Sequence, residues 1–336
     1  MPPNCQRAIR EVTNYAGVSP PRTEALKNIQ HEFASLSPDI IAPAASEIRM
    51  IAALHPIQRA NSNLSLRARF VSISLKVKDI EANPRLAMLY LFHGDGHLRQ
   101  ASLHRVTNDM LSPFLFTAIV MRLNDWALPV RQEAARCLAR ITASSDLAKI
   151  APAIPFLCLQ SKTWLRWQDT RAAYDRIEGT AEIAAYMASH LREGRQGPLA
   201  RQFYTVLRNP SVDIHLPELV ANSATPAVRA AALNALLNGQ TSWPIGQKRQ
   251  WIDKTYGRYR LEFVWDSRPV ASCLNKADLA LKGAKDRSVI VRRIVAAWLL
   301  RSGFPAPEVA ALLVVDASAS IRQIIAIYQK KQGQHA

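Results

Sequence analysis

The sequence predicts an all-α fold, an α-solenoid of about eight to ten stacked helical hairpins, and three observations support this prediction. A short pattern that ends in an aliphatic residue and an arginine recurs along the chain at intervals of about one helical hairpin. Apolar residues follow each copy at the four-residue spacing of one helix face. Glycine supplies only 12 of the 336 residues, which suits helices joined by short turns.

The clearest copy of the pattern runs from Asp125 to Leu138. Asp125 can cap the helix that follows it, and Pro129 suits the first helical turn, where its missing N–H costs no hydrogen bond. Val130, Ala134 and Leu138 then fall on one face of the helix. This segment therefore predicts a helix that begins shortly after Asp125 and buries that face.

Further copies place an aliphatic–arginine pair, or its closest equivalent, at regular intervals. Most neighbouring copies lie 29 to 35 residues apart, which is the length of one helical hairpin in a repeat protein. The interval from Val228 to Val291 measures 63 residues, and we expect it to contain one further helical hairpin that the pattern does not recognise. The aliphatic residues of the copies are Leu66, Leu98, Val130, Leu165, Leu199, Val228, Val291 and Ile321.

The pattern resembles the second helix of the HEAT-repeat family, which begins with the signature Asp-x4-Val-Arg-x2-Ala-Ala-x2-Leu. The resemblance covers roughly residues 60–330. It implies a right-handed α-solenoid in which the signature Asp and Arg form a polar ladder linking adjacent hairpins. Ser223, Gln160 and Gly194 replace the Asp in three copies, so we expect the ladder to be interrupted there. The pairs that match the signature are Asp125/Arg131, Asp286/Arg292 and Asp316/Arg322.

The N-terminal part of the chain does not match the pattern, although it has helical character interrupted by several prolines. We interpret residues 1–60 as a divergent N-terminal helical cap. In this interpretation residues 61–336 form the repeat array, which contains an irregular, aromatic and basic unit at about 240–270.

The charge balance is strongly basic, with 43 Lys and Arg against 26 Asp and Glu, a net charge of +17. The excess is largest toward the C-terminus, where residues 248–301 contain 13 basic and 5 acidic side chains. Such a field attracts nucleic acid or an acidic protein and accelerates the encounter with it. The alternative is that the charge only maintains solubility.

The irregular unit at 240–270 interleaves six basic side chains with six aromatic ones. Cations neutralise phosphates and aromatic rings offer faces on which bases stack, so the combination is typical of nucleic-acid binding. The alternative is that the rings fill the core of an irregular helical hairpin beneath the arginine stems. The candidate anion-binding residues are Lys248, Arg249, Lys254, Arg258, Arg260 and, on a later helix, Arg293. The candidate aromatic platform comprises Trp251, Tyr256, Tyr259 and Trp265, together with Trp164 and Trp167.

The pair Trp164 and Trp167, close to Asp169, raises an enzymatic alternative. One branch of the HEAT-like proteins consists of alkyl-purine DNA glycosylases, which surround a cationic lesion with Trp and a carboxylate. Cation–π contact with the rings and a nearby aspartate would stabilise an oxocarbenium-like transition state. A second set of this kind is Trp251, Trp265 and Asp266.

Metal, redox and membrane chemistry are not indicated by the sequence. His93, Asp95 and His97 could ligate a metal, but they fall in a turn before a helix, where these residue types are ordinary, and we predict no metal or cofactor. The four cysteines lie far apart and form no zinc or redox motif, which favours a reducing, cytoplasmic location. The longest apolar stretch, residues 114–121, is far shorter than the ~20 residues of a membrane span.

Together these features favour a non-catalytic binding protein with a basic surface that recognises nucleic acid or another anionic partner. The first alternative is a scaffold that binds an acidic protein or peptide. The second is an enzyme, a HEAT-like alkyl-purine DNA glycosylase. All three are compatible with an array of helical hairpins, because a fold does not decide which ligand its surface binds.

Overall fold

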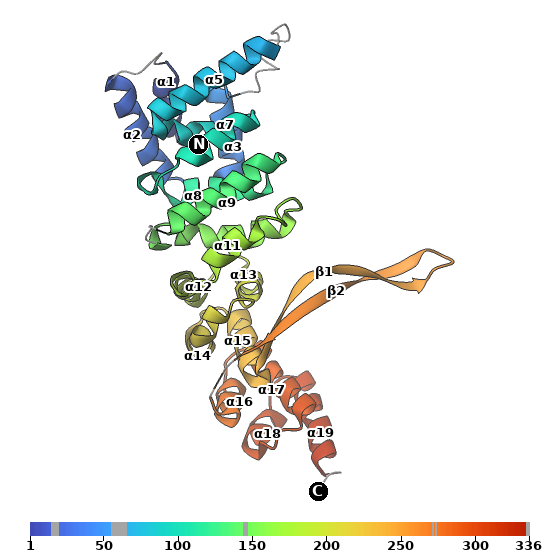
Figure 1. The fold of residues 1–336 in the computed structure, drawn as a ribbon. Helices are drawn as coiled ribbons and strands as arrows, with labels where there is room; N and C mark the ends of the chain where they lie inside the picture. The colour runs from blue at the N-terminus through green and yellow to red at the C-terminus, as the bar shows by residue number, and fades with distance from the viewer. Residues whose placement is uncertain (15–19, 55–65, 144–146, 271, 273, 334–336) are drawn as a thin grey trace. The chain divides into compact units, whose positions relative to one another are not determined.

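The structure is a computed structural model that describes residues 1–14, 20–54, 66–143, 147–270, 272 and 274–333. The described chain is predominantly helical, with one two-stranded antiparallel sheet (Figure 1). The prediction of a helical protein is confirmed, whereas the sheet departs from a purely all-α fold. The chain forms two compact units, Met1–Glu178 and Gly179–Ala336, a division that differs from the boundary predicted after residue 60.

The described residues of the unit Met1–Glu178 are mainly α-helical, with several 3-10 helices between the α-helices. Its α-helices are α1 (Pro3–Asn14), α2 (Pro20–Ala34), α3 (Ile41–Ile51), α5 (Leu66–Ala82), α6 (Ala87–Tyr90), α7 (Gly96–Arg105), α8 (Pro113–Met121), α9 (Leu128–Thr142), α10 (Ile154–Gln160) and α11 (Arg171–Glu178). α7 packs against α5, α6 and α9, and α9 packs in turn against α8 and α11.

The unit Gly179–Ala336 contains the remaining helices and both strands. Its elements are α12 (Ala181–Glu193), α13 (Leu199–Val206), α14 (Leu216–Asn222), α15 (Pro226–Asn238), β1 (Gln240–Asp253), β2 (Arg258–Pro269), α16 (Lys276–Ala284), α17 (Val289–Ser302), α18 (Pro307–Val314) and α19 (Ala319–Gly333). α15 packs against α14, α16 and α17, and α17 packs against α16, α18 and α19.

The helices that carry the signature begin where the sequence predicts. α9, α17 and α19 each start three residues after the signature Asp. The Asp carboxylate accepts a hydrogen bond from the backbone N–H two residues further on, and so caps the turn that leads into the helix. These bonds join Asp125 to Ala127 (3.0 Å), Asp286 to Ser288 (2.7 Å) and Asp316 to Ser318 (2.8 Å).

The apolar face of each signature helix is buried, because its members recur at the spacing of one helix face. In α9 this face comprises Val130, Ala134 and Leu138. In α17 it comprises Val291, Val295 and Leu299, and in α19 it comprises Ile321 and Ile325. The buried face predicted for the helix after Asp125 is therefore confirmed, and α17 and α19 bury the equivalent positions.

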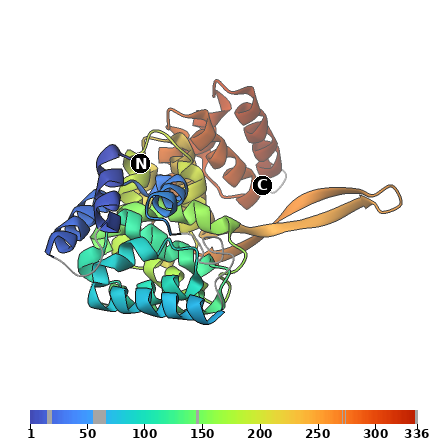
Figure 2. The ribbon, with the colours of Figure 1, turned by 90° about the horizontal axis from the view of Figure 1, so that it is seen from above.

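Residues 240–269 form a β-hairpin, so the prediction of an irregular helical unit there is wrong. Polar and apolar residues alternate along residues 258–263, which is the two-residue period of a strand. The turn is closed by Asp253, whose carboxylate accepts hydrogen bonds from the N–H groups of Thr255 (2.9 Å) and Tyr256 (3.2 Å). Gly257 completes it with φ at 64°, a left-handed conformation that suits glycine. In both views the hairpin extends away from the helices of its own unit (Figures 1 and 2).

The hairpin is an insertion between α15 and α16. Gly239 ends α15 with φ at 63°, and its carbonyl accepts a hydrogen bond from the N–H of Val270 (3.0 Å). The chain therefore leaves and rejoins the helices at one point. Because α15 packs directly against α17, the 63-residue interval is one helical repeat plus the β-hairpin. The further helical hairpin predicted in this interval does not exist.

Candidate functional site

The base of the β1–β2 hairpin is fixed to the helices by Arg268. Its guanidinium forms a two-pronged ion pair with Asp213 (2.8 and 2.6 Å) and donates to the carbonyls of Leu207 and Asn209 (2.9 Å each). Both charged side chains of the pair are 13% exposed. At ~3.3 Å per residue, the 14 residues of β1 span about 45 Å, so most of the hairpin lies beyond this anchor.

One face of the hairpin is aromatic and apolar. In an antiparallel pair, residues opposite each other share a face and successive residues alternate between faces. The register joins Trp251 to Tyr259 and Arg249 to Leu261, and so places their side chains together with those of Phe263 and Trp265. We call Trp251, Tyr259, Leu261, Phe263 and Trp265 the aromatic face; their side chains are 43–56% exposed.

Ring contacts run along the aromatic face. The rings of Trp251 and Tyr259 meet edge to face with centroids 5.5 Å apart, and those of Phe263 and Trp265 do so at 6.3 Å. The guanidinium of Arg249 lies over the Tyr259 ring, 4.8 Å from its centroid. These contacts order the face without burying it, because all five members remain open to solvent.

The opposite face of the hairpin carries several polar and charged side chains, together with Trp243 and Val264. The register pairs Lys248 with Glu262 and Arg260 with Gln250. Arg260 donates hydrogen bonds to both Glu262 (3.0 Å) and Gln250. Part of the positive charge on this face is therefore already compensated within the hairpin.

The turn end of the hairpin is basic and aromatic. Lys254 and Tyr256 lie in the turn, and Arg258 begins β2 with its guanidinium 6.0 Å from the centroid of the Tyr256 ring. All three side chains are exposed. The turn therefore presents two cations and a ring at the point farthest from the anchor.

The predicted cations and rings of residues 240–270 all lie on the β-hairpin. Most of the rings lie on one face of it, and Lys248 and Arg260 lie on the other. The alternative that these rings fill a core is wrong, because Trp251, Tyr256, Tyr259 and Trp265 are all exposed. Leu261 and Phe263 belong to the same surface but were not among the residues predicted for it. The two-residue alternation along β2 was the signal that could have identified them.

Arg293 lies on a different element from the other predicted cations. It is exposed on α17, where its guanidinium donates to the hydroxyl of Ser320 at 3.2 Å. It is not part of the hairpin surface.

Trp164 and Trp167 do not form an accessible platform. They are 7% and 4% exposed, and their rings pack edge to face at 5.0 Å. Trp167 also contacts the buried ring of Tyr174 at 6.0 Å. These two tryptophans are core residues of the unit Met1–Glu178, and this placement corrects the prediction that they bind a ligand.

Neither tryptophan–carboxylate set predicted for a glycosylase converges on a site. Asp169 is exposed, whereas Trp164 and Trp167 are buried. Asp266 follows Trp265 directly in β2, so the two side chains point to opposite faces of the hairpin. The geometry therefore gives this enzymatic alternative no support.

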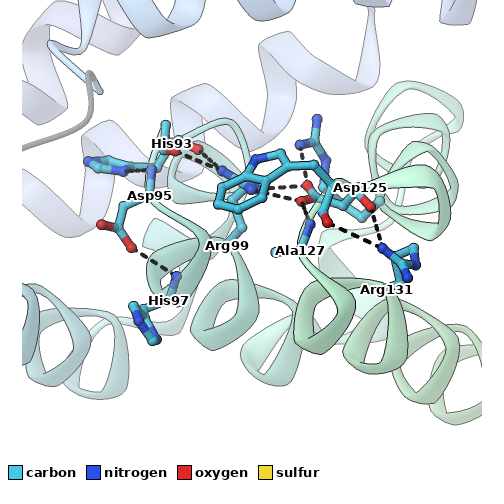
Figure 3. Close-up of polar contacts among 10 residues, drawn as sticks. His93, Asp95, His97, Arg99, Asp125, Ala127 and Arg131 are labelled. Atoms are coloured by element: carbon cyan, nitrogen blue, oxygen red, sulfur yellow. Dashed lines mark hydrogen bonds and ion pairs between the residues drawn. The ribbon is translucent and has the colours of Figure 1, made fainter. Parts of the chain in front are cut away.

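The signature Arg and Asp residues form a ladder in which the Arg of one copy pairs with the Asp of the next copy. Arg99 donates from Nε and Nη2 to the two carboxylate oxygens of Asp125, both at 2.8 Å, and so joins two successive copies (Figure 3). Arg131 instead donates to the backbone carbonyl of Asp125 at 2.9 Å. Burial alone would raise the pKa of the Asp125 carboxyl, but hydrogen bonds from Arg99 and from the Ala127 N–H lower it below its usual value.

The same arrangement occurs twice more, in the unit Gly179–Ala336. Arg229 pairs with Asp286 (2.8 and 3.0 Å), and Arg292 pairs with Asp316 (2.6 and 3.2 Å). Each arginine also donates to the carbonyl of the residue six positions before it. Arg322 repeats only this second contact, to the carbonyl of Asp316 at 2.6 Å. These residues hold helices together and do not form a ligand site.

A groove of about 550 Å³ lies between α5, α7 and α9 in the unit Met1–Glu178. Its charged side chains largely contact one another. His104 lies 3.3 Å from Glu133, and Arg105 pairs with Glu81 at 3.1 Å. This groove could not be predicted from the sequence, because its walls come from three separate copies of the pattern.

The segment between α6 and α7 has the features of a cap. Asp95 is the N-cap of α7 and accepts from the N–H of His97 (2.9 Å), while His93 Nδ1 accepts from the N–H of Asp95 (2.8 Å) (Figure 3). In the part of the chain that the structure describes, no group of three or more His, Cys, Asp or Glu side chains could hold a metal ion. No helix within the described ranges is both long and apolar enough to cross a membrane.

Three cysteines, Cys5, Cys137 and Cys158, are free thiols in the core. Burial raises the pKa of Cys137 to about 12 and that of Cys5 to about 11. Cys273 lies outside the described residues. The described thiols therefore have the environment of structural core residues.

Comparison with known proteins adds no assignment: neither the protein-family models nor the curated proteins include a match to this chain.

Proposed function

We propose that this chain is a non-catalytic nucleic-acid-binding protein, a right-handed HEAT-like α-solenoid that contacts its ligand through the β1–β2 hairpin. The HEAT-like arrangement is supported by the inter-copy pairs Arg99–Asp125, Arg229–Asp286 and Arg292–Asp316. Each joins one copy of the signature to the next, as the ladder of that family would.

One observation carries the binding proposal: the hairpin exposes five cations beside an ordered aromatic face. Cations bind phosphates and release their counterions, while rings contact bases. The surrounding unit adds to the attraction, since residues 179–336 carry 21 Lys and Arg against 11 Asp and Glu. The five exposed cations are Lys248, Arg249, Lys254, Arg258 and Arg260.

The geometry favours this function over the two alternatives. The glycosylase would need an accessible site in which Trp and a carboxylate converge, and neither predicted set provides one. A scaffold for an acidic protein would also use an exposed cationic surface. Yet a row of four aromatic and apolar side chains along β2, with Trp251 opposite Tyr259 and cations nearby, matches stacked bases and phosphates more closely than it matches an acidic peptide.

A variant without the hairpin tests the proposal. Because Gly239 and Val270 are joined by a hydrogen bond, a short Gly–Ser link can replace residues 240–269 and leave the Arg229–Asp286 pair in place. We expect this variant to keep its helical circular dichroism and to lose binding to labelled single-stranded and duplex DNA and RNA in fluorescence anisotropy at low salt.

The matched control reverses two exposed cations on another element, Lys330→Glu and Lys331→Glu in α19. We expect this control to retain most of the affinity, because α19 is not part of the hairpin. If the intact chain binds none of these nucleic acids at low salt, the proposed function is wrong. If the variant without the hairpin binds nucleic acid as tightly as the parent does, the hairpin is not the binding interface.

A further inference from the structure

We infer that the hairpin selects unpaired bases: its ligand is a single-stranded nucleic acid whose bases stack on the aromatic face. This inference rests on the proposed function and specifies the class of nucleic acid. It is carried by the way in which the register of β1 and β2 gathers the rings on one side of the hairpin.

The spacing of the aromatic face suits flat ligands. Tyr259, Leu261, Phe263 and Trp265 occupy every second position along β2 and therefore share one face of the strand. Same-face side chains on a strand recur about every 7 Å, which is twice the ~3.4 Å rise of stacked bases. The exposed side chains of this row therefore recur at an interval that a strand of unpaired bases can match, with base faces stacked against the rings.

Duplex DNA offers little to such a row. Its base faces are covered by neighbouring base pairs, so that only base edges and phosphates remain for a protein. Phosphates need cations, and an exposed row of Trp, Tyr, Phe and Leu supplies none. Unpaired bases present their faces, and stacking on aromatic side chains is the principal contact available to them.

Cations lie where the backbone of a stacked strand would pass. Arg249 is on the aromatic face itself, over the Tyr259 ring. Lys254 and Arg258 extend the row at the turn, beside Tyr256. Arg260, on the other face, is held by Glu262 and Gln250. The cations next to the rings are therefore the ones placed to contact phosphates.

The charge of the hairpin argues against a second copy of the chain as the occupant of this face. Residues 240–269 carry six basic side chains against three acidic ones. Two copies brought face to face would place like charges together at the turn and at Arg249, which is unfavourable. An anionic ligand complements the same surface.

The experiment compares an unstructured oligothymidine with a duplex of the same length, using the full chain and fluorescence anisotropy at one salt concentration. We expect the single strand to bind at least tenfold more tightly. Trp265→Ala and Phe263→Ala should each weaken single-strand binding by about fivefold to a hundredfold, with a much smaller effect on the duplex. Trp265→Phe should restore most of the affinity, because it restores a ring.

Trp126→Ala is the matched control, since Trp126 is exposed (70%) but belongs to the other unit. It should leave both affinities unchanged. Circular dichroism and the thermal midpoint establish that each variant is folded. Tryptophan fluorescence of the parent should be quenched by oligothymidine, and less so in the Trp265→Phe variant.

The outcomes separate the two proposals. Equal or tighter duplex binding, insensitive to Trp265→Ala and Phe263→Ala, overturns the inference and leaves the proposed function standing. If the intact chain binds no nucleic acid at all, both the inference and the proposed function are wrong. Concentration-dependent dimers in light scattering that Trp265→Ala abolishes, without single-strand preference, would assign the face to a second copy and also overturn the inference.

Discussion

Arg229 and Asp286 form a two-pronged ion pair although 57 positions separate them in the sequence. Most of this separation is the β-hairpin, which leaves the helices after Gly239 and returns at Val270. The equivalent pairs Arg99–Asp125 and Arg292–Asp316 span 26 and 24 positions. The pair is thus the same helix–helix contact in all three places, and the insertion does not alter it.

Removing the carboxylate of Asp286 should destabilise the protein. Arg229 has a side chain that is only 4% exposed, so Asp286→Ala leaves a buried charge without its partner. We expect a loss of about 3 kcal/mol in the free energy of unfolding, measured by urea denaturation. Asp266→Asn on the exposed hairpin is the control and should change stability by less than about 0.5 kcal/mol. Equal stability of the two variants would show that the pair is not structural.

Stability should fall steeply in acid because of the three paired carboxyls. The pKa values of Asp125, Asp286 and Asp316 are lower in the folded chain than their usual value. The unfolded chain therefore binds these protons more readily. The contribution is complete above pH ~3.9 and is lost as the pH falls further, through the folded values. Thermal midpoints between pH 7 and pH 2 measure it. Asp316→Asn should flatten the decline, and an unchanged profile in this variant would contradict the assignment.

Nucleic-acid affinity should depend strongly on salt through the turn end of the hairpin. Lys254→Glu combined with Arg258→Glu should weaken binding and reduce the slope of log affinity against log salt, because fewer counterions are released; each lost phosphate contact lowers that slope by about 0.7 for a single strand. The pair Lys330→Glu and Lys331→Glu has the same change in net charge and should leave the slope close to that of the parent. Identical slopes for the two double variants would indicate a general charge effect.

Truncation of two tryptophans to alanine should have very different effects on the free energy of unfolding. Trp167 is buried against Trp164 and Tyr174, so Trp167→Ala should cost about 3–5 kcal/mol of stability. Trp265→Ala should cost less than about 0.5 kcal/mol, because its ring is 54% exposed. Denaturant unfolding of both variants decides the point. A large loss of stability for Trp265→Ala would mean that its ring has a structural role.

The thiols of Cys5 and Cys137 should resist modification in the folded protein. The thiolate is the reactive species, and burial raises both pKa values, to about 11 and about 12. Mass spectrometry after brief treatment with N-ethylmaleimide at pH 7.5 should find both residues unmodified, and both alkylated once the protein is unfolded in urea. Rapid alkylation of Cys137 in the native chain would contradict its placement in the core.

The signature helices could be predicted from sequence because their structure depends on local rules. A capping Asp, an early proline and apolar residues four positions apart define where α9 begins and which face it buries. These features act within one helix, so a single copy of the pattern already contains them.

The hairpin and the ladder could not be predicted in the same way. The period of the repeat predicted a helical unit at 240–270. The two-residue alternation along β2 indicated a strand, but it covers only a few residues. Arg99 and Asp125 both belong to copies of the pattern, but which Arg meets which Asp depends on how helices pack. The burial of Trp164 and Trp167, like the exposure of Trp265, also depends on tertiary packing that spacing alone does not specify.

The closure of the hairpin at Gly239 and Val270 has an evolutionary consequence. An element that enters and leaves through one hydrogen-bonded point can lengthen, shorten or change its surface residues without shifting the register of the helices on either side. Mutation can therefore change the surface of the hairpin while the packing of the helices is preserved. Insertions and deletions between related chains should accumulate at this junction, and the Arg229–Asp286 contact should persist whether or not a hairpin is present.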